Sequence, residues 1–577
     1  MRVRDTDQDS SLSCVTTGDV VIEYITTEEQ KRDLPIENKA KAPIISEQIA
    51  PSSTAASDLS DNDEDDDDCK SVSKSKSFWY AARRNFFKYL KFVGPGLMVS
   101  VAYMDPGNYA TATSAGATNE FSLLFVILVS VFFGIFLQTL CIKLGSVTGL
   151  DLSRSCKEFL PPWLNYLYYF FAEVAIIATD VAEVIGTTVA LNVLMHIPLP
   201  AGVVITLVDV LFVLIAYKPS CCSAKLIRLF EYVVALLVFT VFICFIINLA
   251  LLPKTPQNNV RKVLRGYVPS RQMFENNGII QAVGILGATV MPHSLFLGSA
   301  LVQPRLLEYD VRKGNYSVEP DEEKEGEVGS TSGTDDETKK SKSSESIKDA
   351  KYLSYRPTKA AIKYCLRYSI IELVLTLFTF ALFVNSAILI LSGSTLYNSS
   401  SAAEADLYSI YDLLCSTISP ATGKIFMVAL LFSGQSSGIV CTMAGQIVSE
   451  GHLNWKMKPW KRRIVTRSIA IIPCLVITLC IGRSALNEAL NASQVILSIL
   501  LPFLTAPLIF FTSKKSIMRV KISSGTKDSS GEEGKEEYWN MANNWITTII
   551  GFAIWLFISF LNVYMIVQLG LSHGDLG

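Results

Sequence analysis

The sequence predicts an all-α polytopic membrane protein arranged as two inverted repeats of five helices, and three observations lead to this prediction. Half of the 577 residues are hydrophobic and the mean hydropathy is +0.34, which is too apolar for a soluble chain of this size. Eleven apolar segments are long enough to cross a bilayer. Two of them, with four continuous segments between, are interrupted by proline, which is typical of transporters with inverted repeats.

The apolar segments lie in one stretch of the chain. Residues 1–77 are polar and acidic and contain little that forms a core, so we expect a disordered cytoplasmic tail there. A transporter domain is predicted at 78–570, followed by a short C-terminal tail at 571–577. Its spans are expected at about residues 88–113, 121–141, 164–195, 201–217, 228–252, 279–303, 367–392, 423–449, 464–482, 490–512 and 543–569.

Lys and Arg residues gather in alternate connections and thereby orient the spans. The N-terminal tail and the connections after the even-numbered spans are basic, so they are predicted to be cytoplasmic, and eleven spans then place the C-terminus outside. Two of these connections, about 306–358 and 521–537, are predicted to be disordered. The basic connection 254–271 disagrees with the alternation; either it is a structured external loop or a span is miscounted there. The connection after the seventh span lacks Lys and Arg, and we expect it to be external and glycosylated at Asn398.

Composition also excludes several classes of function. Charges are segregated into tails and loops and form no basic face, so nucleic-acid binding has no support. The 12 Cys residues are scattered without a CxxC pair, which argues against a disulfide framework or a thiolate zinc cluster. Neither a GxxxxGK[ST] phosphate loop nor an HExxH motif occurs, so no ATP-driven pump of that type and no metalloprotease is indicated. We therefore expect no enzyme, but a carrier driven by an ion gradient.

The two interrupted spans carry the first candidate site residues. One contains Asp105-Pro106-Gly107-Asn108, and the other Gly287-Ala288-Thr289-Val290-Met291-Pro292-His293. Proline breaks the helix and leaves backbone groups unpaired at bilayer depth, where they are costly unless they serve a site. Asp105 and Asn108 are three residues apart, as are Ala288 and Met291, so each pair can converge on one ligand.

These four positions offer a carboxylate, an amide oxygen, a backbone carbonyl and a thioether. Oxygen ligands alone suit Ca²⁺ or Mg²⁺, whereas a thioether favours softer ions such as Mn²⁺ or Fe²⁺. The thioether of Met291 is therefore the feature that indicates selectivity for such softer ions. Ordinary packing of a methionine in an apolar helix remains an alternative interpretation. Asp105 is harder to explain structurally, because ionisable groups inside a span are costly and usually functional.

Other ionisable residues also lie inside predicted spans. They are Glu173, Asp180, Glu183, Asp209, Glu231, His293 and Arg467. Asp180 and Glu183 are three residues apart and share one helix face. Carboxylates, imidazoles and guanidinium groups of this kind form either proton relays or structural salt bridges, and the pattern leaves both open.

Four motifs together resemble the Nramp family of proton-coupled divalent-metal transporters, in particular its fungal manganese branch. They are the two interrupted motifs, the stretch from Thr179 to Gly186, and the stretch from Gly434 to Gln446. The resemblance covers about residues 86–570. It implies a LeuT-like fold with two five-helix inverted repeats and one extra helix, giving eleven transmembrane helices.

The resemblance also implies roles for individual residues. Metal would be held by Asp105, Asn108, the Ala288 carbonyl and Met291, and Gln494 of the tenth span would approach it when the site closes. Protons would move by way of Asp105 and a further set of side chains. That set consists of His293, Asp180, Glu183 and Arg467.

This chain departs from the family pattern at two positions near these motifs. Ser294 follows the Met-Pro-His triplet where Asn is common, and His452 stands where many members have Phe. Neither touches a proposed ligand, so the departures bear on fine selectivity rather than on function. We expect His452 to be exposed beside a basic cytoplasmic loop.

The expected function is import of divalent transition metals, Mn²⁺ first and also Fe²⁺, Co²⁺ and Cd²⁺, coupled to protons. Three alternatives stay open: an uncoupled metal channel or facilitator, an amino-acid or sodium symporter, and a transporter-like metal sensor. The expected partners are the metal ions, protons, the lipid bilayer, and ubiquitin-ligase adaptors that act on tail lysines; no cofactor and no nucleic acid is expected. The plasma membrane and the endosomal or vacuolar membrane both fit as locations.

Overall fold

The structure is a computed structural model, and it describes most of the predicted transporter domain. The described residues are 94–206, 224–253, 259–274, 278–316, 355–397, 406–453, 459–480, 483–523 and 537–571. The predicted N-terminal tail, nearly all of the predicted C-terminal tail, the middle of both loops that we predict to be cytoplasmic, Asp209 and the predicted glycosylation site Asn398 lie outside these residues.

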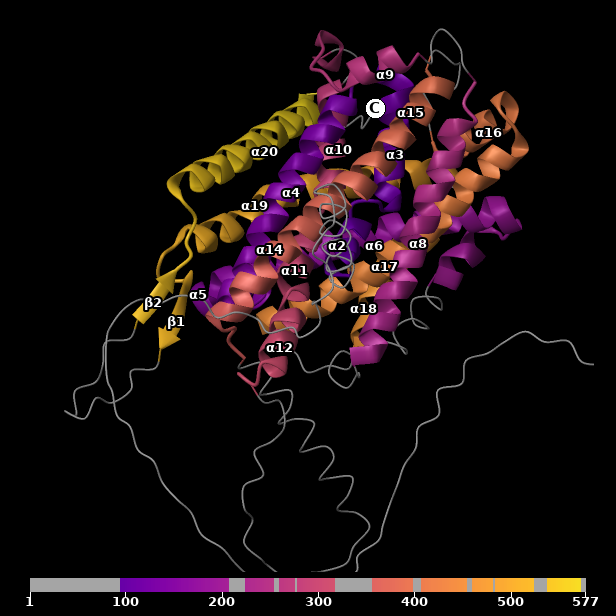
Figure 1. Cartoon of the computed structure of the whole chain (residues 1–577). Coiled ribbons are helices and arrows are strands. Elements are labelled where there is room, and N and C mark those ends of the chain that lie inside the picture. Colours follow the sequence, from indigo (N-terminus) through magenta and orange to yellow (C-terminus); the bar gives the residue numbers. More distant parts are fainter. Residues whose placement is uncertain are drawn as a thin grey trace, which may run out of the picture. The chain divides into compact units, whose positions relative to one another are not determined.

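Helices make up nearly all of the described residues (Figure 1). In the first half of the chain they are α2 (Pro95–Val101), α3 (Pro106–Asn119), α4 (Leu124–Thr148), α5 (Leu152–Phe159), α6 (Pro162–Met195), α8 (Ala224–Ala250), α9 (Val260–Gly266), η1 (Arg271–Phe274), α10 (Gly278–Thr289), α11 (Pro292–Leu301) and α12 (Gln303–Arg312). In the second half they are α14 (Lys359–Thr376), the π-helical turn η2 (Leu377–Ala381), α15 (Leu382–Thr395), α16 (Leu407–Thr417), α17 (Pro420–Leu453), α18 (Pro459–Cys480), α19 (Arg483–Ser513) and α20 (Trp545–Leu571).

The described spans are compatible with the predicted count of eleven. Eight helical stretches among them are long and apolar enough to cross a membrane, and the apolar part of α18 is shorter. The first predicted span is the broken pair α2 and α3, and the fourth, 201–217, lies largely outside the described residues. Exposed apolar side chains along α20, such as Phe552 and Phe560, fit contact with lipid.

Both predicted cytoplasmic loops are more ordered at their ends than expected. Residues 306–312, assigned to the loop 306–358, continue α12 to Arg312. The ends of the loop 521–537 form an antiparallel pair of β1 (Arg519–Ser523) and β2 (Glu537–Asn540). Backbone pairing between residues this far apart leaves no local signal in a segment rich in Ser, Glu and Lys, so the sequence could not indicate it.

Asp310 links the two ends of the loop 306–358 by hydrogen bonds. Its buried carboxylate accepts hydrogen bonds from the Tyr355 hydroxyl at 2.6 Å, from the Thr358 hydroxyl at 2.6 Å and from the Thr358 backbone N–H at 3.0 Å. Thr358 is also the N-cap of α14. Burial, together with the bond to Asp310, raises the pKa of Tyr355 above its ordinary value, so its hydroxyl stays a donor. The seventh span therefore starts at a defined point next to the end of the sixth.

The two breaks lie at the predicted positions, and proline is their physical cause. α2 ends at Val101 and α3 begins at Pro106, while α10 ends at Thr289 and α11 begins at Pro292. A proline has no N–H, so the carbonyl four residues before it loses its helical donor. Side chains of other spans bond carbonyls in the first break: the Asn385 amide donates to the Tyr103 carbonyl at 2.9 Å, and the Ser433 hydroxyl donates to the Met104 carbonyl.

Candidate metal-binding site

Asp105 is the N-cap of α3, and its carboxylate lies 1% exposed at the start of that helix. It accepts from the backbone N–H groups of Gly107 at 3.3 Å and Asn108 at 3.2 Å, and from the Asn108 side-chain amide at 2.6 Å. The unpaired N–H groups of a helix start favour a negative charge, which explains how a carboxylate is tolerated here. The predicted pair Asp105 and Asn108 therefore converges.

Asn108 links the first break to the second. With its amide nitrogen bonded to Asp105, its amide oxygen faces α10, where it lies 3.5 Å from the Thr289 hydroxyl. Thr289 follows Ala288 directly and ends α10. The structure thus brings the two interrupted spans together at Asn108, as the sequence predicts.

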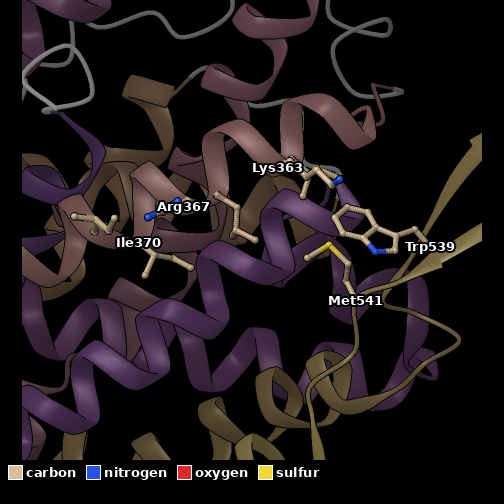
Figure 2. Close-up of a pocket in the computed structure, with 8 residues that line it drawn as sticks. Lys363, Arg367, Ile370, Trp539 and Met541 are labelled. Atoms are coloured by element: carbon tan, nitrogen blue, oxygen red, sulfur yellow. The ribbon is translucent and has the colours of Figure 1, made fainter. Parts of the chain in front are cut away.

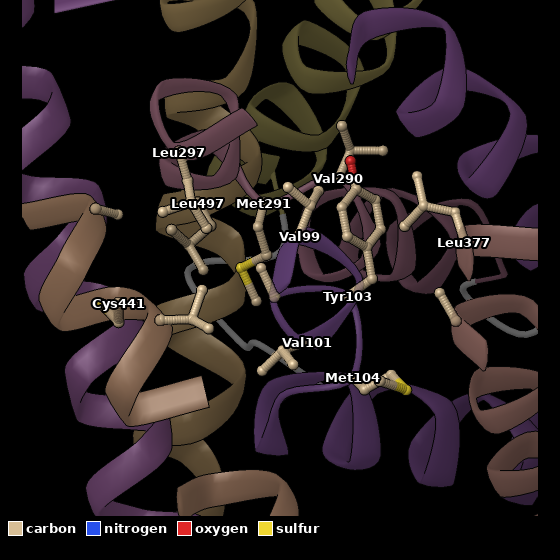
Figure 3. Close-up of a cluster of buried hydrophobic side chains, with 14 of the residues drawn as sticks. Val99, Val101, Tyr103, Met104, Val290, Met291, Leu297, Leu377, Cys441 and Leu497 are labelled. Carbon is tan, nitrogen blue, oxygen red and sulfur yellow. The ribbon is translucent and has the colours of Figure 1, made fainter. Parts of the chain in front are cut away.

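Ala288 and Met291 flank the bend between α10 and α11, and both are fully buried. The helical donor for the Ala288 carbonyl would be the N–H of Pro292, which does not exist, so this oxygen is left without its helical partner. Met291 is the N-cap of α11 in an extended conformation. Its side chain lies in the buried cluster that also contains Val99 and Val101 of α2 (Figure 3). Met291 is therefore surrounded by apolar side chains, and α11 packs against α2 of the first broken span.

Gln494 on α19 lies against the first turn of α3. A methyl group added at Gly107 would overlap the Gln494 amide, so glycine at this position lets the amide approach the break. Gln494 is fully buried; its nitrogen donates to the Ser493 hydroxyl at 3.1 Å, while its oxygen has no hydrogen-bond partner among the described residues. Buried polar atoms are normally hydrogen-bonded, so this amide oxygen is suited to bind a ligand or a water molecule.

The ionisable residues of α6 meet Arg467 of α18. The Arg467 guanidinium lies 3.1 Å from Asp180 and 3.0 Å from Glu183, and all three side chains are buried. His293 of α11 reaches the same helix, with its Nδ1 3.3 Å from the Thr179 hydroxyl. Three of the predicted residues, Arg467, Asp180 and Glu183, therefore form a buried ion pair, and His293 contacts the helix that carries the two carboxylates.

His452 is buried, so the prediction that it is exposed is wrong. α17 continues to Leu453, and its last turn packs His452 against the rings of Tyr169 and Phe296 with 1% of the residue exposed. Its Nδ1 lies 2.6 Å from the Asn165 amide oxygen, which only accepts, so Nδ1 carries the proton. The basic loop starts beyond this turn, and proximity in sequence to that loop was misleading.

Glu372 on α14 is a polar residue that sequence reasoning missed. Its carboxylate accepts from the backbone N–H groups of Gly94 at 2.8 Å and Gly96 at 3.1 Å, and it pairs with Arg305 of α12 at 2.8 Å. It therefore ties the start of α2 to α12 and α14. It lies inside the predicted span 367–392, so the criterion of a charge within a span would have found it.

Comparison with known proteins decides the family. The family model described as "Natural resistance-associated macrophage protein-like" (Nramp) matches residues 96–527. The chain belongs to the Nramp family. This confirms the predicted resemblance and makes the chain an integral membrane transporter rather than an enzyme.

Relatives place the chain in the fungal manganese branch of the Nramp family. It is 60% identical over 519 residues to the manganese transporter SMF1 of Saccharomyces cerevisiae, covering 85% of this chain and 87% of that protein. It is 50% identical over 495 residues to the manganese transporter pdt1 of Schizosaccharomyces pombe, covering 86% and 88%.

A solved Nramp structure supports the fold. The manganese transporter of Eremococcus coleocola, in complex with an aromatic bis-isothiourea substituted compound, matches with a TM-score of 0.64 and 27% identity, covering 88% of this chain and 91% of that chain. The predicted LeuT-like fold class is thereby confirmed, and the described spans are compatible with eleven helices.

Proposed function

We propose that this Nramp-family chain is a secondary transporter that imports divalent transition metals together with protons. Mn²⁺ is the principal substrate in this proposal, with Fe²⁺, Co²⁺ and Cd²⁺ as further substrates. The observation that carries it is the meeting of the two broken spans at Asn108, beside the buried carboxylate of Asp105. The proposal also draws support from the relatives named as manganese and iron transporters.

The proposed ligands are Asp105, Asn108, the Ala288 carbonyl and Met291, with Gln494 joining them when the site closes. The unpartnered oxygen of Gln494 beside Gly107 supports its inclusion. Such a set gives one negative charge, neutral oxygens and one sulfur. A divalent ion that sheds its water easily and accepts sulfur fits it better than Ca²⁺ or Mg²⁺.

The proposed proton path uses Asp105, His293, Asp180, Glu183 and Arg467. Metal would bind Asp105 as a carboxylate, so a protonated Asp105 would lose its proton on binding, and that proton would pass toward His293 and the α6 carboxylates. The contact of His293 with Thr179, next to Asp180 in the chain, supports this route. A proton gradient directed inward then drives metal import.

Alternating access would follow from movement of the short helices at the two breaks. Glu372 bonds the start of α2 and also Arg305, so inward opening requires that these bonds separate. The N-terminus is proposed to be cytoplasmic and the C-terminus external, in a plasma, endosomal or vacuolar membrane. Tail lysines are proposed acceptors for ubiquitin, attached by ligase adaptors, and Asn398 a glycosylation site.

Replacing Met291 by leucine tests whether its thioether binds the metal, because leucine keeps the volume of methionine and removes only the sulfur. We expect Mn²⁺ affinity in uptake to fall by at least about tenfold. We also expect Ca²⁺ in about tenfold excess to inhibit the variant and not the wild type. The measurement is initial Mn²⁺ uptake by vesicles.

Met427→Leu is the matched control. Met427 is also fully buried but lies on α17, and this variant should behave as wild type. If Met291→Leu retained both affinity and resistance to Ca²⁺, its thioether would be packing only. Uptake that follows the metal gradient without responding to pH would favour the channel or facilitator.

A further inference from the structure

A cavity of about 500 Å³ lies between α14 and the end of β2 with the residue that follows it, remote in sequence from the residues of the metal site (Figure 2). We call it the basic groove. Its lining consists of Ile362, Lys363, Leu366, Arg367, Ile370, Ile371, Trp539 and Met541. Most of these residues recur on α14 at intervals of three or four, so the helix presents one continuous stripe to the groove.

The floor of the basic groove is apolar. Leu366, Ile370 and Ile371 line it from α14, and Met541 lines it from the opposite side. A groove of this composition that stayed filled with water would leave apolar area unburied, at a cost proportional to that area. The floor therefore suits a hydrocarbon chain.

The rim of the basic groove is cationic. Lys363 and Arg367 line it, and Lys359 lies one turn earlier on the same face of α14. The ammonium groups of Lys359 and Lys363 lie 5.5 Å and 5.8 Å from the centre of the Trp539 ring, a geometry that holds them at the groove. Within the described residues, no ion pair involves Lys359, Lys363 or Arg367. Positive charge here is thus available to an anion.

The groove lies where a membrane surface is expected. Beyond Arg367, Leu375 near the end of α14 and Phe378 in η2 are 56% and 49% exposed and fit lipid contact. Trp539 lines the groove and Trp545 is exposed at the start of α20, and tryptophans are enriched at membrane interfaces. The cations therefore lie at the polar end of the span and the apolar floor leads toward the bilayer interior.

We propose that the basic groove binds an anionic glycerophospholipid, with its phosphate at Lys363 and Arg367 and an acyl chain along Leu366 and Ile370. A free anion would leave the floor uncovered, and an uncharged lipid would leave the cations unpaired. Basic pockets beside transmembrane helices on the cytoplasmic side recognise lipid headgroups in this manner. Assignment to the cytoplasmic leaflet rests on the orientation proposed above, whereas binding itself does not depend on transport.

The test is lipid binding by the full-length chain in detergent, followed by native mass spectrometry during titration with phosphatidylserine. Phosphatidylcholine of the same acyl chains and inorganic phosphate serve as competitors. We expect one phosphatidylserine site that neither competitor occupies at equal concentration. The double variant Lys363→Gln/Arg367→Gln should weaken it by about fivefold for each charge removed, hence about 25-fold.

Matched variants keep the test decisive. Arg261→Gln/Arg265→Gln removes the same charge from exposed residues of α9 and should leave binding unchanged, and Lys363→Arg/Arg367→Lys should retain it. Elution of each variant as a single species in size-exclusion chromatography verifies folding. Equal binding by wild type and Lys363→Gln/Arg367→Gln would overturn the proposal. Displacement of the lipid by equimolar inorganic phosphate would also overturn it, because that would indicate a site for a free anion.

Discussion

Asp105→Asn is expected to reduce Mn²⁺ uptake by roughly 100-fold while the protein still folds. Asparagine is as good an N-cap as aspartate, so its single amide oxygen should keep the bond from the Asn108 backbone N–H, while the longer bond from Gly107 to the second carboxylate oxygen is lost. What the variant loses is the negative charge at the meeting point of the two broken spans. Initial rates of Mn²⁺ uptake in vesicles, normalised to the amount of folded protein, measure the effect.

Asp151→Asn is the matched control for this result. Asp151 is the N-cap of α5 and accepts from the Arg154 backbone N–H at 2.9 Å, so it has the same capping role outside the proposed site. We expect this variant to transport at the wild-type rate. Full uptake by Asp105→Asn would remove Asp105 from the metal site.

Arg467→Met is expected to destabilise the protein by about 3–5 kcal/mol, because Asp180 and Glu183 would remain buried without their shared cation. The triple variant Arg467→Met/Asp180→Asn/Glu183→Gln removes the charges as well and should recover most of this stability. Thermal unfolding in detergent, read by size-exclusion chromatography, gives the comparison.

The same triple variant separates the two interpretations of this ion pair. If the carboxylates conduct protons, the restored protein should bind Mn²⁺ yet take it up without accompanying protons. If the triple variant transports metal and protons at wild-type rates, the ion pair is structural only. A single Arg467→Met variant that is as stable as the wild type would contradict the account of the buried charges.

The sequence predicted the parts of the site that depend on local chemistry. Proline at 106 and 292 sets both breaks, and the spacing of Asp180 and Glu183 puts them on one helix face, so each could be inferred from neighbouring residues. The fold class followed from the same breaks and from the number of apolar runs. Their meeting in space, through Asn108 and Thr289, was an inference from the pattern of repeats and is now described in atomic contacts.

Contacts between distant segments could not be predicted in this way. His452 is buried because Asn165, Tyr169 and Phe296 come from other helices, and nothing near it in sequence indicates them. The pairing of β1 with β2, and the fastening of a loop by Asp310, likewise join segments whose composition resembles disordered chain. Glu372 differs from these, because a carboxylate inside a span was visible in the sequence and was passed over.

Proton coupling of metal import through this site can be measured directly. The most direct measurement records Mn²⁺ uptake and internal pH together in proteoliposomes of the purified chain, at external pH of about 5.5 and about 7.5 with a neutral interior. If import is coupled to protons, uptake is faster at the lower pH, and the interior acidifies in a manner that requires Mn²⁺ and is absent in Asp105→Asn. Uptake that is equally fast at both values and leaves the internal pH unchanged would contradict this coupling.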